Sequence, residues 1–148
     1  MANEIAVTAS LQVRKDGLQY ISRPQSGVVD MTTGSGPTPG VVAVTDDGVD
    51  INLSALTTPG WCHMYNLSED YYVDVGIWEP DTTTFYPVLR LDVADSRGAK
   101  PCVLRLSPHL GQQFSGTGTG TGTENATLRA KAAPGASGVK IVVSAFDA

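Results

Sequence analysis

Apolar and polar residues alternate with a period of two along much of this chain, and no stretch shows the period of an amphipathic helix. The clearest case is the N-terminal stretch EIAVTASLQVR, in which one face of an extended strand carries Ile5, Val7, Ala9, Leu11 and Val13. Alternation of this kind is typical of strands with one buried face. The chain is therefore predicted to be all-β.

About nine to eleven such segments are separated by turn signals, among them Asp16-Gly17 and the loop Thr33–Gly40, at the spacing typical of a sandwich or barrel. We predict one β-sandwich domain over residues 1–148, with an eight-stranded jelly roll as the preferred architecture. Within it, residues 1–40 are candidates for an extended N-terminal arm or hairpin layer.

Charge and hydropathy exclude several classes of partner. The net charge is −5 and the basic residues form no run, which argues against nucleic-acid binding. No apolar stretch approaches the roughly 20 residues that span a bilayer, and the first residues lack the pattern of a signal peptide. We therefore expect no membrane contact and a chain made and assembled in a cytosol, with Cys62 and Cys102 as buried free thiols.

Eight residues from Gly116 to Thr123 simply alternate glycine and threonine. A phosphate-binding loop needs a strand before it, a helix after it and a lysine, and neither the lysine nor the helical pattern is present. Two interpretations stay open. The run is either a surface loop or a loop ordered by a partner, in which case Thr117, Thr119 and Thr121 contact that partner.

No motif predicts a metal, a cofactor or a catalytic centre. Cys62 and His63 are adjacent, so they face opposite sides of a strand, and the close ligand pairs of zinc sites are missing. Acidic residues between Glu69 and Asp81 are expected in solvated turns, and no G-x-S-x-G elbow is present. The protein is predicted not to be an enzyme.

Aromatic residues concentrate between positions 61 and 86. Alternation places Trp61, His63 and Tyr65 on one strand face, opposite Cys62 and Met64. The favoured interpretation is that this aromatic face is one side of the sandwich core. The alternative is a contact surface for subunits or for carbohydrate, with Trp61, Tyr72 and Trp78 as the contact residues, which requires these rings to share an exposed concave face.

Five different short segments follow one another along the chain: MANEIAVTASLQV, TTPGWCHMYNLSEDYYVDVG, FYPVLRL, CVLRLSP and LRAKAAPGASGVKIVVSAFDA. In this order the chain resembles a family of small virion structural proteins of tailed bacteriophages. Two features depart from the family pattern: the turn DSRGAKP before the Leu-Arg-Leu strand, and the length of the segment 114–124.

The resemblance implies a capsid decoration (cement) protein, or alternatively a tail or fibre component. It implies the major capsid protein and further copies of this chain as partners, and a location on the virion, most of all on the capsid surface, after assembly in the host bacterial cytoplasm. A carbohydrate-binding module and an enzyme are the hypotheses from other classes.

Three segments are the expected contact regions: the N-terminal strand Glu4 to Val13 and the loops Thr33–Gly40 and Ser115–Asn125. A strand that alternates over nine residues is a natural donor to a neighbour's sheet. Ile5, Val7, Leu11 and Val13 are its expected contact residues.

Overall fold

The computed structural model describes residues 5–31, 34, 36–79, 82–106 and 127–147. The chain divides into two compact units, Met1–Thr32 and Thr33–Ala148. All regular elements of the described residues are β-strands, so the predicted all-β fold is confirmed. The division falls before Gly40, the last residue of the predicted arm.

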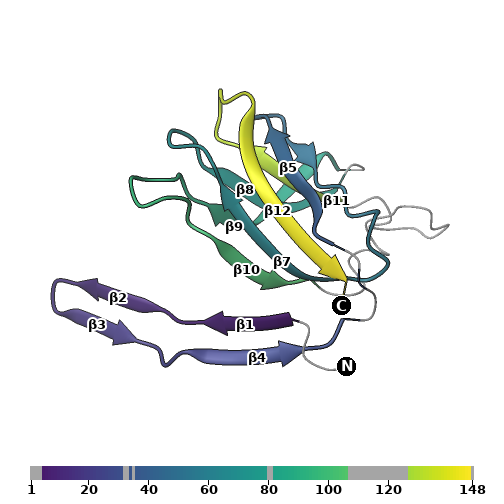
Figure 1. The fold of residues 1–148 in the computed structure, drawn as a ribbon. Helices are drawn as coiled ribbons and strands as arrows, with labels where there is room; N and C mark the ends of the chain where they lie inside the picture. The colour runs from purple at the N-terminus through teal and green to yellow at the C-terminus, as the bar shows by residue number, and fades with distance from the viewer. Residues whose placement is uncertain (1–4, 32–33, 35, 80–81, 107–126, 148) are drawn as a thin grey trace. The chain divides into compact units, whose positions relative to one another are not determined.

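The first unit is a long antiparallel hairpin (Figure 1). Its four strands are β1 (Ile5–Ala9), β2 (Gln12–Lys15), β3 (Leu18–Ile21) and β4 (Gln25–Val29). β1 pairs with β4, and β2 pairs with β3 across the turn at Asp16 and Gly17. Asp16 has a φ of 45°, in the left-handed region that Asp tolerates better than most residues. The alternating N-terminal segment is therefore paired with the segment that follows it.

The pairing continues through the interruption between the two halves of the hairpin. The Ser22 backbone N–H donates a 2.8 Å hydrogen bond to the Leu11 carbonyl oxygen. The partners are Ala9 with Gln25 on one side and Gln12 with Ile21 on the other, so the returning strand holds one extra residue there. An extra residue on one strand is a β-bulge. The extra residue lies on the returning strand, so the alternation of side chains along residues 5–13 is not interrupted. The odd-numbered residues from 5 to 13 therefore lie on one face of the hairpin.

The second unit is a β-sandwich, as predicted, of two four-stranded antiparallel sheets (Figure 1). One sheet has the order β10-β7-β12-β5 and the other β6-β11-β8-β9. The strands are β5 (Thr38–Val44), β6 (Val49–Asp50), β7 (Pro59–Asn66), β8 (Val73–Glu79), β9 (Thr84–Leu91), β10 (Cys102–Arg105), β11 (Thr127–Ala132) and β12 (Val139–Asp147).

The prediction of a loop through Gly40 is wrong at its last three residues, because β5 begins at Thr38. Here Pro39 pairs with Ser144 and Thr38 pairs with Ala145 of β12. Strand pairing outweighs the turn preference of this Pro-Gly sequence. β5 is an edge strand, where a proline costs no ladder hydrogen bond on the open side.

Aliphatic and small side chains from both sheets fill the space between them. Met64, Ile141 and Val143 come from one sheet, and Val73 and Leu91 from the other; all five are almost completely buried. None of the aromatic residues that the structure describes belongs to this buried set. The sandwich therefore has an aliphatic core.

The prediction of which β7 residues share a face is correct, but the prediction that the aromatic face points into the core is wrong. Trp61, His63 and Tyr65 do share one face, yet Cys62 and Met64 on the other face point into the core. On the neighbouring strand β12 the inward residues next to them are small or aliphatic, with Ala145 opposite Cys62 and Val143 opposite Met64. Compact side chains on both strands fill the interior, which places the aromatic face outside.

Gly76 lies at a register shift between β8 and the edge strand β9. A Cβ atom at this position would overlap the Tyr86 carbonyl oxygen and lie 2.8 Å from the Pro87 Cα atom. Both neighbours are backbone atoms, so they cannot move aside as a flexible side chain would. Only glycine fits this close approach of the two strands.

We therefore predict that Gly76→Ala lowers the free energy of unfolding by about 1–3 kcal/mol, the usual range for overpacking a filled site. Urea unfolding followed by circular dichroism measures the change. Gly27→Ala in β4 is the matched control, because a Cβ there meets no atom within 4 Å. Equal stability of Gly76→Ala and the unaltered protein would show that β8 and β9 are not as close as described.

Candidate functional site

The outer face of the β10-β7-β12-β5 sheet, pointing away from the second sheet, is rich in apolar and aromatic side chains. Register places Val41, Val142 and Tyr65 side by side across β5, β12 and β7. His63 and Val103 are neighbours across β7 and β10. We call this surface the apolar outer face and define it by Val41, Trp61, His63, Tyr65, Val103 and Val142.

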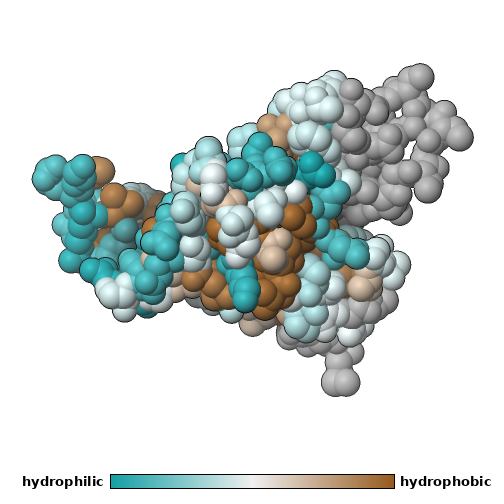
Figure 2. Space-filling model, turned by 90° about the horizontal axis from the view of Figure 1, so that it is seen from above, coloured by the Kyte–Doolittle hydropathy of each residue, from teal (hydrophilic) through white to brown (hydrophobic). Residues whose placement is uncertain are grey.

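Within this face, the His63 and Tyr65 rings lie with their centroids 5.3 Å apart. The Trp61 indole N–H is buried and has no hydrogen-bond partner within the described part of the chain. Val41 and Val103, on the two edge strands, are among the most exposed large apolar residues. Figure 2, which views the molecule from above, shows apolar residues (brown) at the surface among hydrophilic ones (teal). A contiguous apolar face of this kind is typical of a protein-contact surface.

The outer face of the second sheet is different, because charged side chains on it are paired with one another. Arg90 donates two hydrogen bonds to the Asp74 carboxylate, from Nε at 2.8 Å and from an Nη at 3.0 Å. Its hydrogen bond to Asp74 raises the pKa of Arg90 further. Arg129 Nε donates to Asp50 at 2.6 Å, and Thr127 Oγ1 donates to the same oxygen at 3.0 Å. We call this surface the ion-paired face.

The three rings expected at a carbohydrate surface do not come together. Trp61 lies in β7 of the first sheet, whereas Trp78 lies in β8 of the second sheet and Tyr72 directly precedes β8. The Arg129 guanidinium lies 4.2 Å from the Trp78 ring centroid, and that of Arg90 lies 3.8 Å from the Tyr72 ring centroid. These cations occupy the ring faces on which a sugar would stack. The rings form no shared platform.

The hairpin has no interior of its own. Among its described residues, Ile5, Val7 and Val13 are half-buried, Leu11 is exposed, and none is buried. Leu11 lies on the same face as these three. Leu18 and Tyr20 also lie on this face, because Leu18 pairs with Lys15 and Tyr20 pairs with Val13. We call this surface the apolar hairpin face. It contains the four N-terminal contact residues that the sequence predicts.

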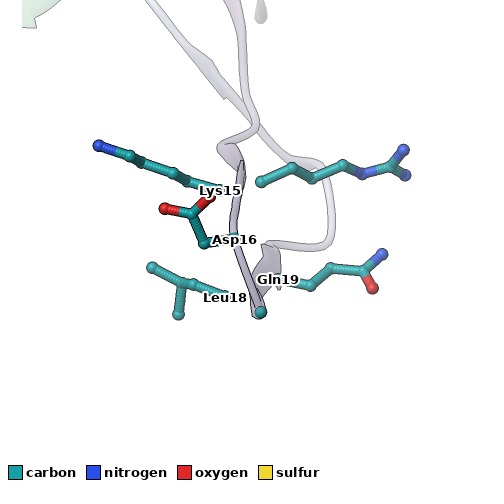
Figure 3. Close-up of a pocket in the computed structure, with 6 residues that line it drawn as sticks. Lys15, Asp16, Leu18 and Gln19 are labelled. Atoms are coloured by element: carbon teal, nitrogen blue, oxygen red, sulfur yellow. The ribbon is translucent and has the colours of Figure 1, made fainter.

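A shallow hollow at the hairpin tip is lined by Arg14, Lys15, Asp16, Gly17, Leu18 and Gln19. Figure 3 shows Lys15 and Leu18 on one side of the ribbon and Gln19 on the other. This separation agrees with the register, which pairs Lys15 with Leu18. The side chains diverge, so they converge on no common point where a ligand would bind.

Asn66 is fully buried at the end of β7, a structural role that no sequence pattern indicated. Its Nδ2 donates to the Tyr71 carbonyl at 2.7 Å, and its Oδ1 accepts from the Ser68 backbone N–H at 2.9 Å. These bonds hold the connection between β7 and β8. The Asn-Leu-Ser triplet at Asn66 matches the glycosylation sequon by chance, and the burial of Asn66 agrees with that interpretation.

Thr117, Thr119 and Thr121 lie outside the described residues, as does the whole segment 107–126. Within the described residues, no group of three or more His, Cys, Asp or Glu side chains is placed to hold a metal ion. The same part of the chain has no helix long and apolar enough to cross a membrane. Comparison of the chain with protein-family models, with curated protein sequences and with solved structures finds no match.

Burial of the Cys62 thiol, and to a smaller extent the nearby Cys102, raises the pKa of Cys62 from 9.0 to about 12. At pH 8 we predict that Cys62 resists maleimide in the native protein and reacts once urea unfolds the chain, because only the thiolate attacks. Peptide mass spectrometry measures the labelling of each cysteine. The pKa of Cys62 is higher in the folded protein than in the unfolded chain. Its contribution to the free energy of unfolding is therefore fully present below pH 9 and is lost as the pH rises toward about 12. Rapid labelling of native Cys62 would contradict its burial.

Proposed function

We propose that this protein is a structural protein of a tailed-bacteriophage virion, and specifically a decoration protein that binds across capsid subunits and stabilises the head. The observation that carries the proposal is the hairpin of residues 5–29, which contains no buried residue. An isolated two-stranded hairpin is marginally stable at best in water. A chain that retains one is built to place it against other molecules.

The distribution of exposed apolar residues supports this function. Eleven large apolar residues are strongly exposed in the part of the chain that the structure describes, and five of them lie in the hairpin: Leu11, Leu18, Tyr20, Ile21 and Val28. Two more, Val41 and Val103, lie on the apolar outer face. Monomeric proteins rarely keep apolar patches without a function for them. Contact with other proteins is the use that fits both surfaces.

We infer further that the sandwich is a jelly roll. Every connection from β5 to β12 crosses between the sheets, except that β8 and β9 are neighbours in one sheet. The resulting orders, β5-β12-β7-β10 and β6-β11-β8-β9, are those expected of eight antiparallel strands wound as a jelly roll. Jelly rolls recur in viral capsids, which supports the proposed role by analogy of fold.

In the proposed mechanism, each copy buries apolar surface against its neighbours on the shell. The ion-paired face remains in water, because its Arg and Asp side chains already satisfy one another. Each contact need only be of standard size or smaller, since the gain is repeated at every copy. Separating the shell then requires breaking many of these contacts together.

The proposal is tested on particles of the phage that encodes the chain. We expect mass spectrometry of purified virions to detect this chain in a fixed ratio to the major capsid protein. Heads prepared from a phage in which the gene is deleted should lose DNA at a lower temperature and recover when purified protein is added back. Fluorescence of a DNA-binding dye during heating measures the release.

An abundant host protein of similar size serves as the control for co-purification. Absence of the chain from virions would overturn the proposed function. Its presence on tails alone would replace the decoration role by a tail role.

A further inference from the structure

We propose that the protein forms an oligomer by exchange of its hairpin: the apolar hairpin face of one copy packs on the apolar outer face of a second copy's sandwich. This inference rests on the proposed function in one respect only, because an assembly protein is expected to occur as several copies. The two contact surfaces are therefore the apolar hairpin face of one copy and the apolar outer face of the other.

The hairpin carries more of its apolar residues on one side than on the other, although the other side also carries the exposed Ile21 and Val28. Its odd-numbered residues, Ile5 to Val13, and their partners Leu18 and Tyr20 make up the apolar hairpin face. The opposite face carries Thr8, Gln12 and Arg14. A two-stranded ribbon with one apolar face becomes stable when a third layer or further strands cover that face.

The sandwich supplies a matching surface on one of its two outer faces. The ion-paired face is internally satisfied through Asp74 with Arg90 and Asp50 with Arg129. The apolar outer face presents mainly rings and branched aliphatic side chains, and register adds the exposed Arg105 beside Trp61 and the exposed Lys140 beside Ala43 to the same side of the sheet. A ribbon laid on it would form a third β-layer, packed face to face as sheets normally pack.

The dimensions of the two surfaces agree. The hairpin strand from Ile5 to Lys15 is about 36 Å long at the usual rise per residue, and β12 is about 30 Å long. A ribbon aligned with β12 therefore covers the length of the apolar outer face. Its two strands, about 5 Å apart, cover the middle of a sheet whose outer strands are about 14 Å apart.

Charge favours this pairing over contact between two sandwiches. Residues 1–32 contain three basic and three acidic residues, so the entire net charge of −5 falls on residues 33–148. Two sandwiches in contact would repel each other, whereas a neutral hairpin does not repel an acidic sandwich. Contact between two hairpins would leave the apolar outer face uncovered.

A second copy satisfies both surfaces at once, because each chain has one hairpin to give and one sandwich to receive it. Reciprocal exchange between two copies closes a symmetric dimer, and exchange in one direction closes a ring. In both cases every apolar hairpin face is covered. The opposite hairpin face, with Ile21 and Val28, stays free for the shell.

The first experiment measures the mass of the full chain in solution by light scattering after size-exclusion chromatography. We expect a multiple of 15.5 kDa for the unaltered protein. Tyr20→Asp on the apolar hairpin face and Val41→Asp on the apolar outer face should each return the mass to that of a monomer. Circular dichroism checks that the sandwich of each variant is folded.

Two matched controls have nearly the same exposure and lie on the wrong faces. Ile21 is 55% exposed beside Tyr20 at 53%, but on the opposite face of the hairpin. Val88 is 70% exposed beside Val41 at 63%, but lies in β9 of the other sheet. Ile21→Asp and Val88→Asp should keep the oligomer. Loss of the oligomer in the controls as well would overturn the assignment of faces.

The second experiment tests which copy receives the hairpin. Two differently tagged chains, one with Tyr20→Cys and the other with Val142→Cys, are refolded together in a Cys102→Ala background and treated with a short bis-maleimide. We expect a cross-linked species that carries both tags, and much less of it when Ile21→Cys replaces Tyr20→Cys.

A monomeric unaltered protein, or cross-linking only when both cysteines are in one chain, would overturn hairpin exchange. Neither result bears on whether the chain is present in virions, which mass spectrometry of particles decides separately. Conversely, an exchanged oligomer absent from virions would overturn the proposed function and leave the hairpin exchange in place.

Discussion

The structure depends on one constraint: each strand of a two-layer sandwich has two faces, and the core can cover only one of them. Met64, Ile141 and Val143 occupy the covered faces of β7 and β12. Apolar residues on the other faces of these strands, such as Tyr65 and Val142, have no second layer of the sandwich to cover them. Tyr65 and Val142 are half-buried, and Val41 and Val103 on the same face are exposed. Full burial of an exposed aliphatic side chain is worth roughly 1.5–3 kcal/mol, so a further layer over this face would add stability.

The two outer faces of the sandwich meet this constraint in different ways. Asp50 and Asp74 pair with arginines whose guanidinium groups also cover Trp78 and Tyr72, so polar and aromatic groups are satisfied within one chain. The residues that define the apolar outer face take part in none of these ion pairs or cation–π contacts. Exposed ion pairs contribute little stability, and here they matter by making one face self-sufficient in water.

Alternation in the sequence predicted the all-β fold and, on β7, which residues share a face. It separated Trp61, His63 and Tyr65 from Cys62 and Met64 correctly. It did not indicate which set points inward, because that depends on the volume left by the neighbouring strand, and Ala145 and Val143 of β12 are more than seventy residues away. The same long-range pairing places Pro39 in a strand, against its local preference for a turn.

In the hairpin, too, alternation indicates which residues share a face but not what covers that face. The alternation from Ile5 to Val13 predicts one buried face, and a single chain's structure leaves that face half-buried at most. Either the pattern is misleading over nine residues, or the burial it encodes occurs between molecules. The turn at Asp16 and Gly17 and the bulge in the returning strand place Leu18 and Tyr20 on the same side as Ile5 to Val13, whereas Ile21 and Val28 lie on the other side. In the hairpin exchange that we propose, the burial that this pattern predicts is completed by the sandwich of a second copy.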